Sequence, residues 1–170
     1  MSFTDLAKKR CSIRSYETKP VESEKIAAIV EAAHVAPSAA NRQPVRLIQV
    51  ESAEGLANLG RYANLYGAPL AFIVCADAER AWKRPVDGMV STAIDASITC
   101  DHMMIAATDL GLGSVWICAF DPVGVREAFN LPASLVPVNI LAVGHAADEW
   151  KSPERHAVER IPVQELVTKA

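Results

Sequence analysis

The chain has 170 residues, of which 51% are hydrophobic and 22% are charged, and its formal net charge at pH 7 is −3. This length and apolar content suit a single globular domain over residues 1–170 with one hydrophobic core. The slightly acidic charge, without a long basic block, argues against a nucleic-acid partner and against binding to an anionic membrane surface.

The expected location is the cytoplasm. The first residues lack the charged-then-apolar pattern of a signal peptide, and the longest uncharged run, over 128–147, contains prolines and asparagines typical of a turn and a buried strand. The four cysteines, at positions 11, 75, 100 and 118, are far apart and form no Cys-x-x-Cys motif. We therefore expect reduced thiols and no membrane partner.

The first 60 residues predict helices on either side of a turn-forming segment and one strand. Ser2 and Asp5 stand at the spacing of a capping box, and Pro37 ends the second helix. The apolar stripe of that helix consists of Ile26, Ile29, Val30 and Ala33. The expected elements are, in chain order, helices over 2–9 and 22–34, a strand over 45–50 and a short helix from residue 52.

The middle of the chain predicts three apolar strands separated by helices. The expected elements are, in chain order, a central strand over 70–75, a surface loop over 77–88, a long helix over 90–110, a strand over 114–120, a helix from 121 to about 129 and a strand over 136–144. Ile94, Ile98 and Ile105 predict that the long helix is buried. Asp121-Pro122 is the usual N-cap and first position of a helix.

The alternation of strands and helices predicts an α/β or α+β class with a layered sheet, and it leaves the strand order open. After residue 148 the composition becomes polar and basic. We expect 148–170 to be a tail that packs on the surface or on a partner chain.

Arg10-Cys11-Ser12-Ile13-Arg14 places two guanidinium groups and a hydroxyl within five residues. Arginine forks make paired, charge-assisted hydrogen bonds, so this cluster suits a phosphate. Alternatively, it is only the basic end of a helix, which the helix dipole favours.

Pro37-Ser38-Ala39-Ala40-Asn41-Arg42-Gln43-Pro44 is a turn-forming segment with two amide side chains. Asn41 and Gln43 can pair with the donor and acceptor edge of a flat ring. Alternatively, the segment is a loop whose Ser and Asn hydrogen-bond their own backbone. A phosphate site and a ring site together suggest a mononucleotide cofactor.

Several common sites are absent from the sequence. Gly111-Leu112-Gly113 follows a helix and precedes a strand, which is the reverse of the order in a dinucleotide fingerprint. No P-loop motif and no His-x-x-x-His pair occur, and the adjacent residues of Cys100-Asp101-His102 would point in different directions on a helix, so no metal is expected. For Cys11 and Cys118, packing is a simpler role than nucleophilic catalysis with His145.

Four segments in order resemble the nitroreductase family of flavin-dependent oxidoreductases. They are Arg10-x-Ser12-x-Arg14, Pro37-Ser38 with Asn41-x-Gln43-Pro44, the run from Ala107 to Pro122, and Val143-Gly144-His145 followed by the basic tail. The resemblance covers nearly the whole chain. It implies an α+β sandwich with a central mixed, mostly antiparallel sheet flanked by helices, and a homodimer in which both chains contribute to the cofactor sites.

The resemblance also implies FMN at the dimer interface and assigns residues to it by position. Arg10, Cys11 and Ser12 would hold the phosphate, with Arg155 as a second phosphate contact. Pro37, Ser38, Asn41 and Gln43 would approach the flavin from the partner chain, and the backbone of Ile117, Cys118 and Ala119 would lie at flavin N5. The flavin performs the chemistry, so no catalytic side chain is assigned; Arg14 would face the N1/O2 edge and tune the flavin.

The implied reaction is electron transfer from NADH or NADPH through flavin N5 to a nitroaromatic, quinone or similar acceptor, by a ping-pong mechanism. Alternatives that keep the flavin are dehalogenation, enone reduction and flavin breakdown; another is a flavin-binding or sensing protein with little turnover. The electron donor stays open. Arg42, Lys83 and Arg84 could each meet the 2′-phosphate of NADPH, although exposed basic residues are usually only solvated.

Overall fold

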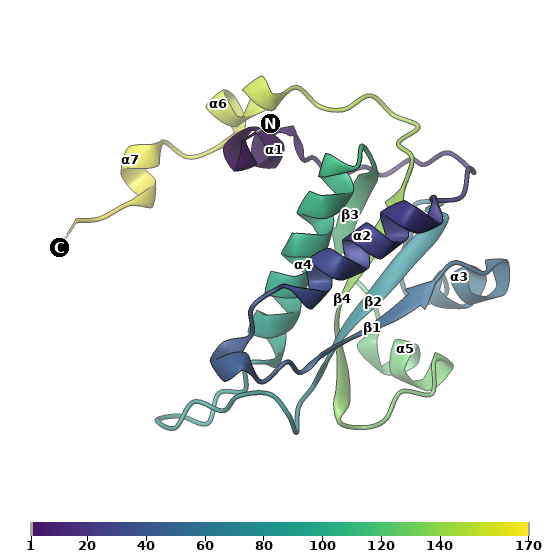
Figure 1. Cartoon of the computed structure of the whole chain (residues 1–170), viewed down its shortest axis with the longest axis vertical. Coiled ribbons are helices and arrows are strands. Elements are labelled where there is room, and N and C mark those ends of the chain that lie inside the picture. Colours follow the sequence, from purple (N-terminus) through teal and green to yellow (C-terminus); the bar gives the residue numbers. More distant parts are fainter. Residues whose placement is uncertain (1, 170) are drawn as a thin grey trace.

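The computed structural model of the chain describes residues 2–169 and has one antiparallel sheet with helices on both faces (Figure 1). The strands are β1 (Val45–Val50), β2 (Leu70–Asp77), β3 (Gly113–Ile117) and β4 (Leu135–Gly144). Their order across the four-stranded sheet is β1-β2-β4-β3, and every neighbouring pair is antiparallel. The one parallel pairing within residues 2–169 is the isolated bridge between Ser12 and Ser114. The α+β class expected from the sequence is confirmed.

Residues on β2 alternate between the two faces of the sheet and so build two cores. Phe72 and Val74 pack with Met103 on one face, whereas Ile73 and Cys75 pack on the other. Successive side chains of a strand point to opposite faces, so a strand covered on both sides reads as a continuous apolar run. The prediction that this run is a central strand is therefore confirmed.

Two pairs of helices cover the sheet. Helices α2 (Ser23–His34) and α4 (Thr92–Asp109) cover one face, and α3 (Ala53–Leu59) and α5 (Pro122–Ala128) cover the other (Figure 1). Ile29 of α2 and Leu59 of α3 are fully buried. Each such side chain stabilises the fold by about 1.5–3 kcal/mol when it leaves water.

Most of the predicted helix starts are confirmed by their caps. In α1 (Phe3–Lys9), Ser2 and Asp5 form the reciprocal bonds of a capping box. The Ser52 hydroxyl accepts from the Gly55 N–H at the start of α3, and the Asp121 carboxylate accepts from the first turn of α5. These starts follow from local hydrogen bonds, which is why the sequence predicts them well.

The long helix is confirmed and buried along one face, and the stripe of α2 packs on the core, but some of the expected apolar positions lie away from the core. Ile94 of α4 is 48% exposed, and Ile98 and Ile105 are only half-buried. Val30 of α2 is likewise 38% exposed. The face of α4 that packs on the sheet carries small and flexible residues instead, namely Ala96, Cys100, Met103 and Ala107. The α4 isoleucines therefore form a second apolar stripe that no other part of residues 2–169 fully covers.

The strand predicted over 114–120 is shorter than expected. β3 ends at Ile117, and Cys118 and Ala119 are exposed. Phe120 pairs with Ala63 in an isolated bridge, which ties the segment after β3 to the loop after α3. The exposed turn at 118–119 thus lies at the end of a rigid strand.

The C-terminal segment extends away from the body of the molecule (Figure 1). It contains the turn η2 (Pro153–Arg155) and the short helices α6 (His156–Glu159) and α7 (Val163–Leu166). Its apolar side chains are exposed, namely Val158, Ile161, Val163, Leu166 and Val167. Arg155 nevertheless attaches the first part of this tail to the main chain of Lys8 and Arg10, whereas packing of the tail on a partner chain stays a prediction. None of the helices in residues 2–169 combines the length and hydrophobicity that crossing a bilayer requires.

Candidate functional site

The segment Arg10–Arg14 runs beside β3 and is held there by its alternating side chains. The N–H of Ile13 donates to the Ser114 carbonyl at 3.0 Å. Cys11 and Ile13 are each only 3% exposed and point into the core, whereas Arg14 is exposed. Because alternate residues of an extended segment face opposite sides, Arg10, Ser12 and Arg14 share the outer side. The sequence prediction that these three act together is compatible with this geometry.

Gly113 explains how closely this segment approaches β3. A Cβ at Gly113 would lie 2.8 Å from Cγ1 of Ile13. Separations under 3.0 Å are essentially never seen for a real Cβ, so glycine is required for the contact. The Tyr16 hydroxyl also donates to the Ile13 carbonyl at 2.8 Å and fixes the end of the segment.

The outer side of the segment forms a basic pocket of about 220 Å³ together with the C-terminal tail. Its lining residues are Arg10, Cys11, Ser12, Arg14, Lys151, Arg155, His156, Glu159 and Arg160. The lining therefore contains five Lys or Arg side chains and one carboxylate, that of Glu159. None of the five basic side chains forms a salt bridge within residues 2–169. Burial and the nearby charge of Arg155 lower the pKa of Arg10. Five cations against one carboxylate leave a surplus of positive charge that favours an anion, and a phosphate matches guanidinium geometry.

Arg155, which lines the basic pocket, connects the C-terminal tail to the end of α1. Its Nη2 donates to the Arg10 carbonyl at 2.6 Å, and its Nη1 donates to the carbonyls of Ser152 at 2.9 Å and Lys8 at 3.2 Å. Most of its N–H donors are therefore used on the main chain. Arg155 also lines the basic pocket, and the phosphate contact expected of it stays a prediction.

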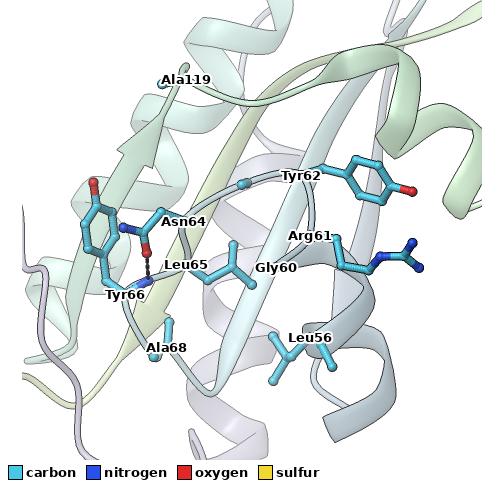
Figure 2. Close-up of a pocket in the computed structure, with 12 residues that line it drawn as sticks. Leu56, Gly60, Arg61, Tyr62, Asn64, Leu65, Tyr66, Ala68 and Ala119 are labelled. Atoms are coloured by element: carbon cyan, nitrogen blue, oxygen red, sulfur yellow. Dashed lines mark hydrogen bonds between the residues drawn. The ribbon is translucent and has the colours of Figure 1, made fainter.

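A second pocket, the Tyr66 pocket, has its own lining residues, and its Tyr66 lies beside Arg14 of the basic pocket. Cζ of Arg14 lies 5.8 Å from the centroid of the Tyr66 ring. The Tyr66 pocket has a volume of about 700 Å³ and is bordered by the segment from Leu56 to Ala68 and by Ala119. Figure 2 shows the Tyr66 ring and the Asn64 amide on one side, and Arg61 and Tyr62 on the other.

Local hydrogen bonding fixes the position of Tyr66. The Asn64 side chain accepts from the Tyr66 N–H at 2.9 Å, and Tyr66 and Gly67 both have positive φ, +56° and +76°. A tyrosine in the left-handed region costs energy, so the turn is held against strain. The ring is thereby fixed beside Arg14 and the end of β3.

The turn after β3 presents free main-chain donors. The N–H groups of Cys118 and Ala119 make no hydrogen bond with any group in residues 2–169. Ala119 borders the Tyr66 pocket. The Cys118 thiol lies 3.9 Å from Oδ1 of Asn139, which also accepts from Trp116 Nε1 at 2.8 Å. A ring with a hydrogen-bond acceptor at its edge could therefore bind against this turn.

The second sequence motif forms a strained loop. Ala40, Asn41 and Gln43 all have φ near +50°, which is uncommon for residues other than glycine. The loop is held by Ser38, whose hydroxyl accepts from the Gln43 N–H at 2.9 Å. Gln43 Nε2 also donates to Oδ1 of Asn41 at 3.1 Å. Strain of this kind is concentrated at functional sites.

The two sequence motifs lie toward opposite ends of α4 (Figure 1). The Ala39 N–H donates to Oδ1 of Asp95 in the first turn of α4 at 2.8 Å, while Arg10 contacts Sδ of Met104 at 3.9 Å. Asp95 and Met104 are nine positions apart on the helix, which corresponds to about 13.5 Å along its axis. One chain therefore does not bring the strained loop to the basic pocket.

Sequence reasoning missed several residues at these pockets. The tail residues Lys151, His156 and Arg160 join the basic pocket from more than 130 positions away, and no local pattern marks them. Asn64 and Tyr66 did carry a signal, since the run before β2 ends in Tyr-Gly-Ala-Pro, which is typical of a turn. No group of three or more metal-ligating side chains occurs in the part of the chain that is described.

Comparisons with known proteins agree on one family. The Nitroreductase family model matches residues 7–64 and 56–145. A solved nitroreductase family protein from Clostridium difficile 630 is 49% identical, with a TM-score of 0.97, over 99% of this chain and 98% of that chain. An FMN-dependent nitroreductase from another Clostridium difficile strain is 31% identical, with a TM-score of 0.76, over 86% and 89%. FMN reductase (NAD(P)H) of Bacillus subtilis is 34% identical over 91% of this chain and 70% of its own length.

Proposed function

The chain belongs to the nitroreductase family, and on that basis we propose that it is an FMN-dependent oxidoreductase that uses NADH or NADPH to reduce a small acceptor. The similar proteins named FMN reductase and FMN-dependent nitroreductase support the cofactor and the donor. The acceptor that we propose is a nitroaromatic, a quinone or a comparable planar molecule.

The observation that carries this proposal is the basic pocket. Five Lys or Arg side chains surround about 220 Å³ without a carboxylate partner, which fits the phosphate of FMN. Arg10 and Ser12 would bind the phosphate directly, and Arg155 would hold the tail over it. Cys11 would contribute through its backbone, because its side chain is buried.

The flavin ring would lie in the Tyr66 pocket, because Tyr66 stands next to Arg14, which lines the basic pocket. When bound there, FMN would supply the hydride and electron transfer between the nicotinamide donor and the acceptor. Arg14 would place positive charge near the edge of the ring, where reduction adds negative charge. The free N–H groups at Cys118 and Ala119 would donate to the ring, and Ile117 fixes the turn by ending β3.

The remaining wall of the site would come from a second copy of the chain. Pro37, Ser38, Asn41 and Gln43 lie too far from the basic pocket to serve it within one chain, so we propose that they contact the partner's flavin. Two exposed apolar surfaces support a homodimer: the α4 stripe of Ile94, Ile98 and Ile105, and the tail residues such as Val158 and Leu166. Surfaces of this kind mark association sites.

An open face of the flavin would receive the donor and the acceptor in turn, which predicts ping-pong kinetics. The Tyr66 pocket is bordered by small residues at Gly60, Ala63 and Ala68 and has room for a planar molecule. No charged residue of this pocket other than Arg61 restricts the acceptor. We therefore expect a broad range of acceptors.

The test is an anaerobic titration of the purified, FMN-loaded protein with NADH and with NADPH, followed at the flavin absorbance bands. Bleaching by either donor, with colour restored by a nitroaromatic or a quinone, supports the proposal. A protein that takes up no FMN contradicts it. Bleaching without acceptor reduction would leave a flavin-binding protein with little turnover, and loss of the flavin itself in air would indicate flavin breakdown.

A further inference from the structure

The loop between β2 and α4 forms a cleft that the proposed flavin site does not use. This Trp82 cleft has a volume of about 580 Å³ and is lined by Arg42, Glu79, Arg80, Ala81, Trp82 and Lys83. Arg42 comes from the strained loop, directly after Asn41. The Trp82 cleft therefore adjoins the segment that we propose contacts the partner's flavin.

The Trp82 cleft has a surplus of positive charge. Arg42, Arg80 and Lys83 form no salt bridge within residues 2–169, and Glu79 is the one carboxylate in the lining. By contrast, the neighbouring Arg84 donates to both carboxylate oxygens of Asp87 at 2.8 Å. The three unpaired cations are thus available to an anion, whereas Arg84 is already neutralised.

The backbone around the Trp82 cleft is fixed by hydrogen bonds. The Ser91 N–H donates to the Trp82 carbonyl at 2.9 Å, and Lys83 pairs with Val90 in an antiparallel bridge. The Ala81 N–H donates to the Asp77 carbonyl at 3.0 Å. Trp82 itself is half-buried and lines the same cleft as the three cations. A flat ring can stack on the indole while a charged group meets the cations.

We propose that the Trp82 cleft binds the 2′-phosphorylated adenosine of NADPH and so makes NADPH the preferred donor, an inference that rests on the proposed function. Arg42, Arg80 and Lys83 would bind the 2′-phosphate, and the adenine would stack on Trp82. The pyrophosphate of the dinucleotide separates the adenosine from the nicotinamide. A nicotinamide on the partner's flavin therefore leaves the adenosine free to bind beside Asn41 and Arg42. NADH lacks the 2′-phosphate and would lose these charged contacts.

The first test measures the dissociation constants of 2′,5′-ADP and of 5′-AMP for the FMN-loaded protein by isothermal titration calorimetry. We expect 2′,5′-ADP to bind about tenfold more tightly at low salt, since a dianion meeting two or three cations gives charge-assisted hydrogen bonds. The double variant Arg42→Ala/Lys83→Ala should lose this preference. Arg84→Ala is the matched control and should keep it, because Arg84 is paired with Asp87.

The second test compares anaerobic flavin reduction by NADPH and by NADH in the same proteins. In the double variant, we expect the second-order rate constant of flavin reduction by NADPH, measured at limiting donor concentration, to fall about tenfold. The corresponding rate constant for NADH should be unchanged. The inference would be overturned if the unaltered protein bound 2′,5′-ADP and 5′-AMP equally, or if the double variant kept the preference for 2′,5′-ADP. In either case, reduction of the flavin by NADH would still support the proposed function. Absence of FMN binding or of reduction by either donor would instead refute the proposed function.

Discussion

The guanidinium of Arg14 lies over the ring of Tyr66, with 5.8 Å between Cζ and the ring centroid. This contact joins the basic pocket to the Tyr66 pocket, and it comes from residues that are 52 positions apart. An arginine held at the junction of a phosphate site and a ring site can act on both. We therefore expect substitutions of Arg14 and of Tyr66 to change the properties of bound FMN.

Replacing Arg14 by Ala should lower the midpoint potential of bound FMN. The positive charge near the ring stabilises the reduced, more negative flavin, and its loss should shift the potential by tens of millivolts, on the order of 1–2 kcal/mol for an exposed arginine. The measurement is a redox titration against dyes of known potential. Arg14→Lys keeps the charge and should shift the potential less; an unaltered potential in Arg14→Ala would exclude the tuning role.

Replacing Tyr66 by Leu should weaken FMN binding about two- to fivefold, because the cation–π contact is worth roughly 0.5–1 kcal/mol at an exposed arginine. Tyr66→Phe keeps an aromatic face and should bind FMN nearly as tightly. Both variants keep a side chain at the strained φ of +56°, so their folding costs are comparable. Fluorescence quenching of FMN gives the dissociation constants. Equal values for the Leu and Phe variants would show that the ring does not position Arg14.

Replacing Ile94 by Glu should weaken the proposed homodimer. Ile94 is 48% exposed on the stripe of α4 that other helices leave open, and a charge there would be buried without a partner on association. We expect the dissociation constant of the dimer to rise at least about tenfold, as measured by analytical ultracentrifugation. Val123→Glu on α5, where Val123 is 60% exposed, is the control and should leave the dimer intact. A monomeric unaltered protein would contradict the assembly itself.

Glu22 should contribute stability that depends on pH. A hydrogen bond from Lys19, supported by the charge of His145, lowers the pKa of Glu22 to about 2. A carboxylate whose pKa is lower in the folded than in the unfolded chain stabilises the fold above its unfolded pKa, near 4.3, and loses this contribution as the pH falls toward 2. Urea unfolding of Glu22→Gln should therefore show lower stability than the unaltered protein at pH 6 and a converging value near pH 2. Glu24→Gln, two residues further along the chain, is the control and should leave the free energy of unfolding nearly unchanged at both pH values, because Glu24 forms no ion pair within residues 2–169.

The elements that the sequence predicted well are those fixed by neighbouring residues. Caps at Ser2, Ser52 and Asp121 depend on bonds over three residues, and the apolar run of β2 depends on burial on both sides. The choice of which residues of α4 are buried was partly wrong, because polar side chains on its inner face are satisfied locally and so can be buried in place of isoleucines. Asp95 accepts from the Ser91 hydroxyl at 2.7 Å, and Thr108 donates to the Met104 carbonyl at 3.0 Å.

The candidate site was only half predictable for a related reason. Arg10, Ser12 and Arg14 are close in sequence and alternate on one extended segment, so their common pocket follows from local geometry. The contribution of Arg160 and the contact between Arg14 and Tyr66 depend on where the tail and the loop before β2 fold back. Such contacts arise from tertiary packing, which spacing along the chain does not encode.

Helix α4 holds the strained loop near its start and contacts Arg10 near its end. If each site combines the basic pocket of one chain with the strained loop of the other, then a mutation in the basic pocket affects one site of the dimer. A mutation in the strained loop of the same chain affects the other site. A dimer made from one Arg14→Ala chain and one Asn41→Ala chain would carry one site with both defects and one site with neither. Co-expression of the two impaired alleles should therefore restore up to one unaltered site per mixed dimer, a form of complementation between alleles that a self-contained monomer would not allow.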